Sequence, residues 1–135
     1  MNDRPFLDTN ILIYAIANDE RRTSQAEALL GAGGVVSVQV LNELAAVARK
    51  KLGMSWPEVA DALSAVRTLC PNPIPLSVDT HEMGLRLASE YGVHIYDGLI
   101  LAAALEAKCL IVYSEDMQAG QTIDGRLRIE NPFAN

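Results

Sequence analysis

The sequence predicts an α/β protein, specifically a three-layer α/β/α sandwich around a mainly parallel central sheet. Short apolar segments alternate with helical patterns along the chain, and helices between successive strands are the connections that parallel strands require. The 135 residues are 50% hydrophobic, which is enough for one packed core. No internal repeat or linker interrupts the pattern, so we expect a single domain over residues 1–135.

The first part of the chain is expected to hold two strands and three helices. Residues 5–7 form a short apolar strand, which a helix over 11–17 follows at once. A second helix, over 23–30, stops at a glycine-rich stretch. The β-branched run 35–38 has the length of a buried strand, and residues 39–52 continue as a long helix.

The middle of the chain reads as a helix, a strand and another helix. Residues 55–69 open with a serine and, three residues on, a glutamate, which is the spacing of a capping box at a helix start. Residues 74–78 form the expected third strand. Asp79 or Thr80 then caps a helix that runs to Tyr91.

The last part of the chain contains the clearest strand. Residues 97–107 are a strongly apolar helix, and the apolar run 109–113 has the pattern of a buried strand. A final short strand is expected around 127–129. Strands separated by helices in this order favour a parallel sheet with helices on both of its faces.

The charge balance argues against a protein that coats nucleic acid through bulk positive charge. Lys and Arg number 11 against 17 Asp and Glu, so the net charge is −6 at pH 7. Two cysteines and two histidines are too few for a disulfide framework or a structural zinc site. The N-terminal residues lack the apolar core of a signal peptide, and no apolar run is long enough to span a membrane. We therefore expect a cytoplasmic protein with no membrane partner.

Two acidic residues are expected at the edge of the sheet where open parallel sheets usually bind ligands. Asp8 directly follows the first strand, and Asp116 lies just after the strand that ends at Tyr113. Because the carboxyl ends of parallel strands meet at one edge, these two carboxylates are expected to share it, although they come from distant parts of the chain.

Two further acids lie on apolar helical faces. Glu43 shares a stripe with Val40, and Asp97 begins an almost wholly apolar helix. An ionised carboxylate in such a place is costly unless it is paired or coordinated. Each of the three aspartates could equally be a simple helix cap, and Glu43 could lie at the rim of the core.

Four converging carboxylates would repel one another unless a positive charge lies between them. Oxygen ligands without His or Cys suit hard divalent cations such as Mg²⁺ or Mn²⁺. A cluster of this kind is typical of phosphodiester hydrolysis, in which one ion lowers the pKa of the attacking water and a second can stabilise the leaving oxygen. A phosphatase of the haloacid-dehalogenase kind needs a second acid two residues after Asp8, where this chain has Asn10.

Four sequence blocks resemble the PIN-domain ribonucleases, in particular the VapC-type toxins of bacterial and archaeal toxin–antitoxin pairs. They are Leu7-Asp8-Thr9-Asn10-Ile11-Leu12, Ser37-Val38-Gln39-Val40-Leu41-Asn42-Glu43-Leu44, Tyr96-Asp97-Gly98-Leu99-Ile100 and Tyr113-Ser114-Glu115-Asp116-Met117. In this order and spacing the blocks cover nearly the whole chain. The resemblance implies that the sandwich is PIN-like.

The same resemblance implies a metal-dependent endoribonuclease that is the toxin of a type II toxin–antitoxin pair. The acids it carries over as catalytic and metal-binding residues are Asp8, Glu43, Asp97 and Asp116. The polar residues that would hold water, metal or phosphate are Thr9, Asn10, Ser37 and Ser114. The implied cofactor is Mg²⁺ or Mn²⁺, and the implied partners are an RNA substrate, a small antitoxin and a second copy of the chain in a homodimer.

Other charged and aromatic residues allow more than one interpretation. Glu115, beside the last acid of the quartet, could be an auxiliary ligand, a substitute for that acid or a solvated neighbour, and we favour the last. Arg21 and Arg22 could contact RNA phosphates. The cations over 49–51 are better explained by the dipole of their helix, and Trp56 as an anchor of the next helix.

Two other functions are open to a chain with these motifs. One is a PIN-like RNA-processing nuclease outside any toxin–antitoxin pair. The other is a catalytically silent domain that only binds a partner, although an intact acidic quartet argues against it.

Overall fold

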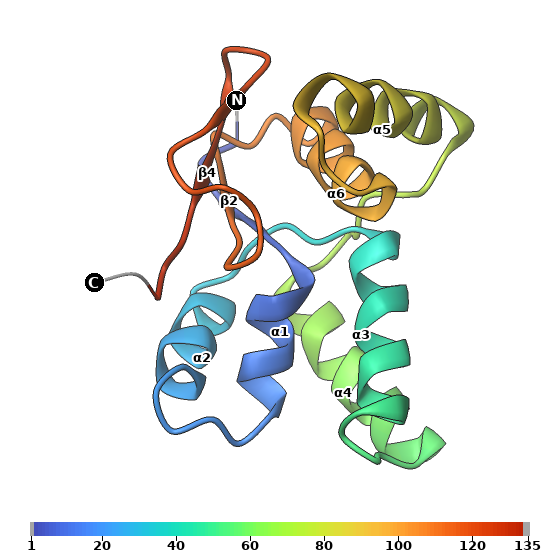
Figure 1. The fold of residues 1–135 in the computed structure, drawn as a ribbon. Helices are drawn as coiled ribbons and strands as arrows, with labels where there is room; N and C mark the ends of the chain where they lie inside the picture. Colours follow the sequence, from blue (N-terminus) through green and yellow to red (C-terminus); the bar gives the residue numbers. More distant parts are fainter. Residues whose placement is uncertain (1, 134–135) are drawn as a thin grey trace.

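A four-stranded sheet lies at the centre of the structure, a computed structural model that describes residues 2–133. Across the sheet the strands follow the order β1 (Phe6–Leu7), β2 (Ile111–Tyr113), β4 (Leu127–Glu130) and β3 (Thr122–Ile123). β1, β2 and β4 are parallel, while β3 runs antiparallel to β4. In register, Leu7 lies opposite Tyr113, so the first and last parts of the chain are neighbours in the sheet (Figure 1).

Two of the predicted strands are reduced to single bridges. Val35 pairs with Phe6, and Ser37 pairs with Ile74, which extends the sheet beyond β1 without forming further strands. The prediction of strands over 35–38 and 74–78 is therefore wrong. The first is cut short because a helix already begins at Val38, and the second because prolines on both sides of Ile74 lack the N–H that a ladder needs.

All six helices of residues 2–133 lie between β1 and β2 in the sequence, and β2, β3 and β4 follow one another without a helix between them. The helices are α1 (Thr9–Ile16), α2 (Thr23–Gly31), α3 (Val38–Lys50), α4 (Trp56–Leu69), α5 (Val78–Tyr91) and α6 (Ile95–Glu106). In Figure 1, α5 and α6 pack together at the upper right, while α1 to α4 fill the lower half. The arrangement is the predicted three-layer α/β/α sandwich.

Several helix starts differ from the sequence prediction. α1 begins at Thr9, two residues earlier than expected, because Asp8 caps it. α5 is capped by Ser77, whose hydroxyl accepts a hydrogen bond from the Thr80 N–H at 3.1 Å, and not by Asp79 or Thr80. α6 begins two residues earlier than expected, because the Nδ1 atom of His94 accepts from the N–H of Tyr96 at 3.1 Å. The capping box at the start of α4 is present as predicted.

Helix α6 lies in the interior of the protein. Its residues from Gly98 to Leu105 are all buried, in contact with α5 on one side and with the sheet's core side chains. A methyl group on Gly98 would collide with the backbone carbonyl oxygen of Gly84 in α5, so the two helices can pack this closely only because Gly98 has no side chain. This contact positions the first turn of α6, which carries Asp97. Within residues 2–133, no helix has the length and apolar character needed to cross a membrane.

Candidate active site

Asp8 lies at the carboxyl edge of the sheet, where β1 and β2 end side by side. Its N–H donates to the carbonyl of Tyr113, the last residue of β2, at 3.0 Å. Its carboxylate caps α1, because Oδ1 accepts from the N–H of Thr9 at 2.6 Å. The capping role that the sequence allowed for Asp8 is thus real, and it uses one carboxylate oxygen.

The second carboxylate oxygen of Asp8 faces side chains from both ends of the chain. Oδ2 accepts from the Ser114 hydroxyl at 2.7 Å and from the Asn10 side-chain amide at 3.5 Å. Asp8 is only 3% exposed, and this burial raises its pKa to about 7, against the lowering effect of its hydrogen bonds. The nearby charges of Asp97 and Glu43 raise it further.

Asn10 links this buried aspartate to the loop after β2. The side-chain nitrogen of Asn10 also donates to Asp116 Oδ2 at 3.1 Å, and the side-chain oxygen Oδ1 of Asn10 accepts from the backbone N–H of Glu115 at 3.2 Å. Ser114 closes the same loop by accepting from the N–H of Met117 at 3.2 Å. The structure therefore places Asp8, Asn10, Ser114 and Asp116 in one hydrogen-bonded group.

Glu43 reaches the group from α3. Its Oε1 accepts from the Thr9 hydroxyl at 3.1 Å and its Oε2 from the Gln39 amide at 2.9 Å. Gln39 was not predicted as a site residue, although its position four residues before Glu43 on the same helical face was a signal for it. The Ser37 hydroxyl accepts a hydrogen bond from the Val40 N–H at 3.2 Å and so caps the start of α3.

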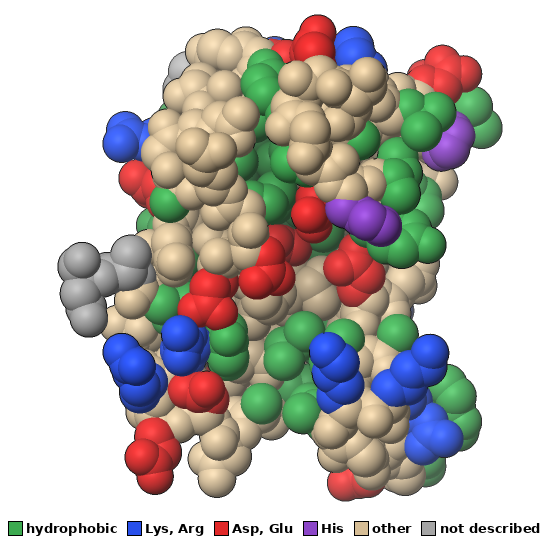
Figure 2. Space-filling model, viewed as in Figure 1, with side chains coloured by type: hydrophobic (Ala, Val, Ile, Leu, Met, Phe, Trp, Pro, Cys, Tyr) green, Lys and Arg blue, Asp and Glu red, His purple; other side chains and the backbone are tan. Residues whose placement is uncertain are grey.

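Asp97 completes the group from the first turn of α6. It is half-buried, and burial raises its pKa, with further contributions from the charges of Glu43 and Asp116; His94 opposes the rise. Across the described part of the chain, none of the four acids forms an ion pair with Lys or Arg. Figure 2 shows acidic side chains gathered near the middle of this face, with Lys and Arg side chains below them in two groups.

These carboxylates fit a divalent cation by their chemistry. All four offer oxygen ligands alone, the set that Mg²⁺ and Mn²⁺ prefer. Burial first, and then neighbouring acids, raise the pKa values of Asp8 and Asp97, and a bound cation would act in the opposite direction. Among residues 2–133, no three acidic, His or Cys side chains are grouped as a metal ion requires. Donors such as Thr9 and Asn10 occupy carboxylate oxygens between the acids, so binding an ion would require the side chains to rearrange.

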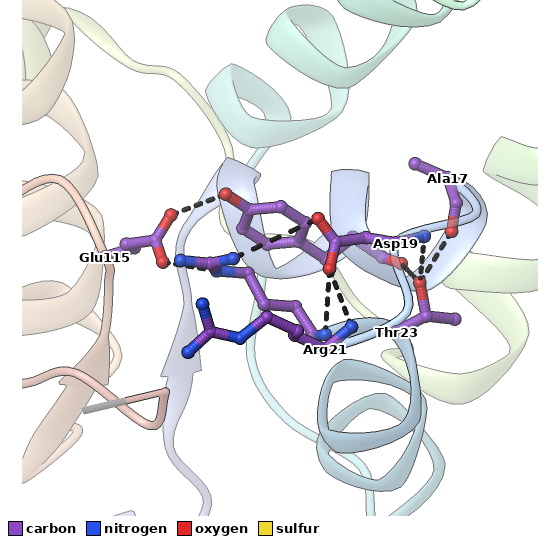
Figure 3. Close-up of polar contacts among 7 residues, drawn as sticks. Ala17, Asp19, Arg21, Thr23 and Glu115 are labelled. Atoms are coloured by element: carbon purple, nitrogen blue, oxygen red, sulfur yellow. Dashed lines mark hydrogen bonds and ion pairs between the residues drawn. The ribbon is translucent and has the colours of Figure 1, made fainter. Parts of the chain in front are cut away.

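Glu115 turns away from this group, although it is the neighbour of Asp116. Its two carboxylate oxygens accept from the Tyr14 hydroxyl at 2.5 Å and the Arg22 Nε at 2.6 Å (Figure 3). Partial burial acts against these bonds, but together they lower the pKa of Glu115. Glu115 is thus a partly exposed, ion-paired neighbour of Asp116, and neither of its carboxylate bonds involves another acid of the group. The alternatives for its role that the sequence left open remain predictions.

The two predicted RNA-contacting arginines lie in different surroundings. Arg22 is held by Glu115 and stacks its guanidinium over the rings of Tyr14 at 5.2 Å and Phe133 at 5.8 Å. Arg21 is exposed, and its backbone N–H is anchored on Asp19 at 3.0 Å (Figure 3). Both line a pocket of about 260 Å³ together with Phe133. Of the two, Arg21 has the freer side chain.

Comparisons with known proteins identify the family. Residues 6–122 match the PIN domain, and no curated protein matches the sequence. Among solved structures, a toxin–antitoxin complex from Klebsiella pneumoniae contains a similar chain, with a TM-score of 0.71 and 24% identity over 95% of this chain and 97% of that one. VapBC2 from Rickettsia felis, bound to a DNA fragment from its promoter, aligns with a TM-score of 0.64 and 22% identity over 93% and 96% of the two chains. These structures share the fold, and the match over most of the sequence shows that the chain belongs to the PIN domain family.

Proposed function

We propose that this chain is a Mg²⁺- or Mn²⁺-dependent endoribonuclease and the toxin of a type II toxin–antitoxin pair. The observation that carries the proposal is the convergence of Asp8, Glu43, Asp97 and Asp116 at one sheet edge, with neutral hydrogen-bond donors and no arginine or lysine paired to them in the described residues. Membership of the PIN domain family supports nuclease chemistry at this edge.

The four carboxylates would hold the metal. A bound divalent ion lowers the pKa of water and offsets the charge of a phosphodiester. The chain's own polar residues set the directions of the carboxylates: Ser114 and Asn10 orient Asp8, Asn10 orients Asp116, and Thr9 orients Glu43. Ser37 acts one step further away, through the start of α3.

The substrate and partners are proposed on resemblance and charge. RNA is the substrate of the VapC-type toxins that the four sequence blocks resemble. Both similar structures come from toxin–antitoxin systems, which supports a small antitoxin as partner of this chain. A net charge of −6 and the acidic edge suit an antitoxin that places a basic side chain there. A homodimer is proposed on the resemblance alone.

Inducible expression in a bacterial host tests the function, with wild type compared to Asp8→Asn and Asp124→Asn. Wild type is expected to arrest growth and produce discrete RNA fragments, and Asp8→Asn to do neither. Asp124→Asn removes the same charge from a carboxylate that is paired with Arg86, so it should behave as wild type. Arrest and fragments from Asp8→Asn would contradict the proposed site, and an inactive wild type would contradict the toxin function.

A further inference from the structure

A groove separate from the acidic group lies between α3 and the start of α4. Its volume is about 530 Å³, and the residues that line it are Asn42, Ala45, Ala46, Arg49, Lys50 and Trp56. The lining includes two cations, Arg49 and Lys50, and one aromatic residue, Trp56. The small side chains of Ala45 and Ala46 leave space in the groove beside them. Nothing in the proposed metal site uses any of the six.

Trp56 is exposed in this groove and does not anchor its helix in the core. Its side chain is 65% exposed, whereas α4 packs inward through Val59 and Val66. The guanidinium of Arg49 stacks on the indole at 4.7 Å from the ring centre, and Arg49 is itself fixed by donating to the carbonyl of Met54 at 2.8 Å. Arg49 lies over one face of the indole, and the high exposure of Trp56 indicates that the ring can still be approached from solvent by a planar group.

The charge of the groove is positive in a protein that is acidic overall. Arg49 and Lys50 are both exposed, and within residues 2–133 neither forms an ion pair with a carboxylate. The dipole of α3 explains why cations occur at its end, but it explains Lys51 equally well. It does not explain why Arg49 and Lys50 line a groove beside an exposed tryptophan.

The groove and the acidic group share helix α3, which carries Glu43 and five of the six residues that line the groove. Glu43, Ala46 and Lys50 are spaced by three and four residues, so they follow one another along the same face of α3. At a rise of 1.5 Å per residue, Lys50 lies roughly 10 Å along the helix from Glu43. A short single strand of nucleic acid can span that distance without leaving this face.

We propose that this groove is a nucleotide-binding subsite for single-stranded RNA, next to the acidic group. A base would stack on the face of the Trp56 indole that Arg49 does not cover, and the adjacent phosphates would lie against Arg49 and Lys50. The side-chain amide of Asn42 would form a hydrogen bond with a base edge. The subsite rests on the proposed function, because it gives a ribonuclease a place to hold the strand beside the bond it cuts. An aromatic face beside two cations matches a base with its phosphate better than it matches an acidic peptide.

Binding to the subsite can be measured without cleavage, because Trp56 is the single tryptophan of the chain. Its emission is followed while a short oligouridylate is added to the full-length protein in EDTA, and affinities of all variants are measured with a fluorescently labelled strand. Wild-type emission should be quenched saturably. Trp56→Ala should weaken binding by roughly 5- to 150-fold, the range for losing one base–aromatic stack, and Trp56→Phe should retain most of the affinity.

Lys50 and its neighbour Lys51 provide a matched pair of charge variants. Lys50→Ala should lower the slope of log affinity against log salt concentration by about 0.7, the change for one lost phosphate contact on a single strand. Lys51→Ala removes the same charge outside the groove and should leave the slope unchanged. An abasic strand of equal length should bind more weakly and should not quench the emission.

Several results would overturn the subsite. Two of them concern the Trp56 emission: no response to the oligouridylate, or equal quenching by the abasic strand. The others are equal changes of the salt slope in Lys50→Ala and Lys51→Ala, and quenching by the antitoxin but not by RNA. The proposed function fails separately: RNA that binds with quenching but is not cut when Mn²⁺ is added contradicts the nuclease and leaves the subsite standing. RNA that is cut by wild type and by Trp56→Ala with the same KM contradicts only the subsite.

Discussion

Two groups of carboxylates in this protein differ in their surroundings. Asp124, between β3 and β4, is held by Arg86 at 2.6 Å and by the Tyr91 hydroxyl at 3.2 Å, and these contacts, the arginine first, lower its pKa. Glu115 likewise has an arginine and a tyrosine, and its pKa is lowered too. Asp8 and Asp97 form no ion pair with Lys or Arg in the described residues, and burial raises their pKa values, with His94 opposing the rise for Asp97.

The difference separates structural acids from acids that await a ligand. An acid paired with arginine inside the chain has its counter-charge and serves to fasten two segments together. An acid that folding buries among other acids lowers the stability of the metal-free protein when it is ionised, and either a proton or a cation from outside reverses that effect. In this chain the second kind occurs at the carboxyl edge of the parallel strands, where ligands are expected.

Cleavage of RNA should distinguish the two groups most strongly. With Mn²⁺ present, Asp97→Asn is expected to lower the cleavage rate by about 100- to 1000-fold, the range of the loss from removing one electrostatic group of an active site. Asp124→Asn, which removes an equal charge from a paired acid, should stay within a few-fold of wild type. Rates are measured with purified proteins whose fold is checked by circular dichroism. A fully active Asp97→Asn would remove Asp97 from the proposed site.

The pH dependence of stability should have opposite signs for the two groups. Asp8 has a folded-state pKa of about 7 against 3.8 normally, so its contribution is fully present at low pH and is lost as pH rises from about 4 to 7, by about 4 kcal/mol. Asp124, with a lowered pKa, contributes stability at neutral pH that is lost as pH falls below its ordinary value.

Urea unfolding in EDTA across this pH range checks both signs. The free energy of unfolding of the wild type minus that of Asp8→Asn should decrease as the pH rises towards 7. The same difference for Asp124→Asn should decrease towards acid pH. A wild-type curve parallel to that of Asp8→Asn would mean that Asp8 ionises normally in the folded protein.

Thermal stabilisation by Mn²⁺ should show the smallest of these effects. At 100 times the dissociation constant, a metal that binds only the folded state adds about 2.7 kcal/mol, which raises the melting temperature of the wild type. The gain should vanish in Asp8→Asn and persist in Glu115→Gln, which removes an equal charge beside Asp116 without touching the acidic group. If Glu115→Gln also lost the gain, Glu115 would be an auxiliary ligand after all.

Features that depend on local sequence were predicted well. The α/β class, the capping box of α4 and the position of Asp8 after β1 follow from patterns a few residues long. The placement of Asp8 and Asp116 at one edge needed one further assumption, that β1 and β2 are parallel, which the helices between them made reasonable.

Features that depend on distant residues were not predictable in the same way. The partners of Glu115 lie 93 and 101 residues away in sequence, so no local pattern could separate an ion-paired acid from a solvated one. β3 was missed because it has two residues and is defined only by its pairing with β4 across a tight turn. Whether Trp56 faces the core or solvent depends on how α4 packs, since its helical position allows either.

The hydrogen bond between Ser114 and Asp8 has a consequence for synthesis of the protein. These residues are 106 positions apart, and Asp116 is as far from Asn10. A chain emerging from the ribosome therefore contains Asp8 early, but it lacks β2 and every residue of the loop after it until most of the sequence has been translated. An unfinished chain cannot assemble the acidic edge, so any activity that depends on that edge begins only when the ribosome making the protein has nearly completed it.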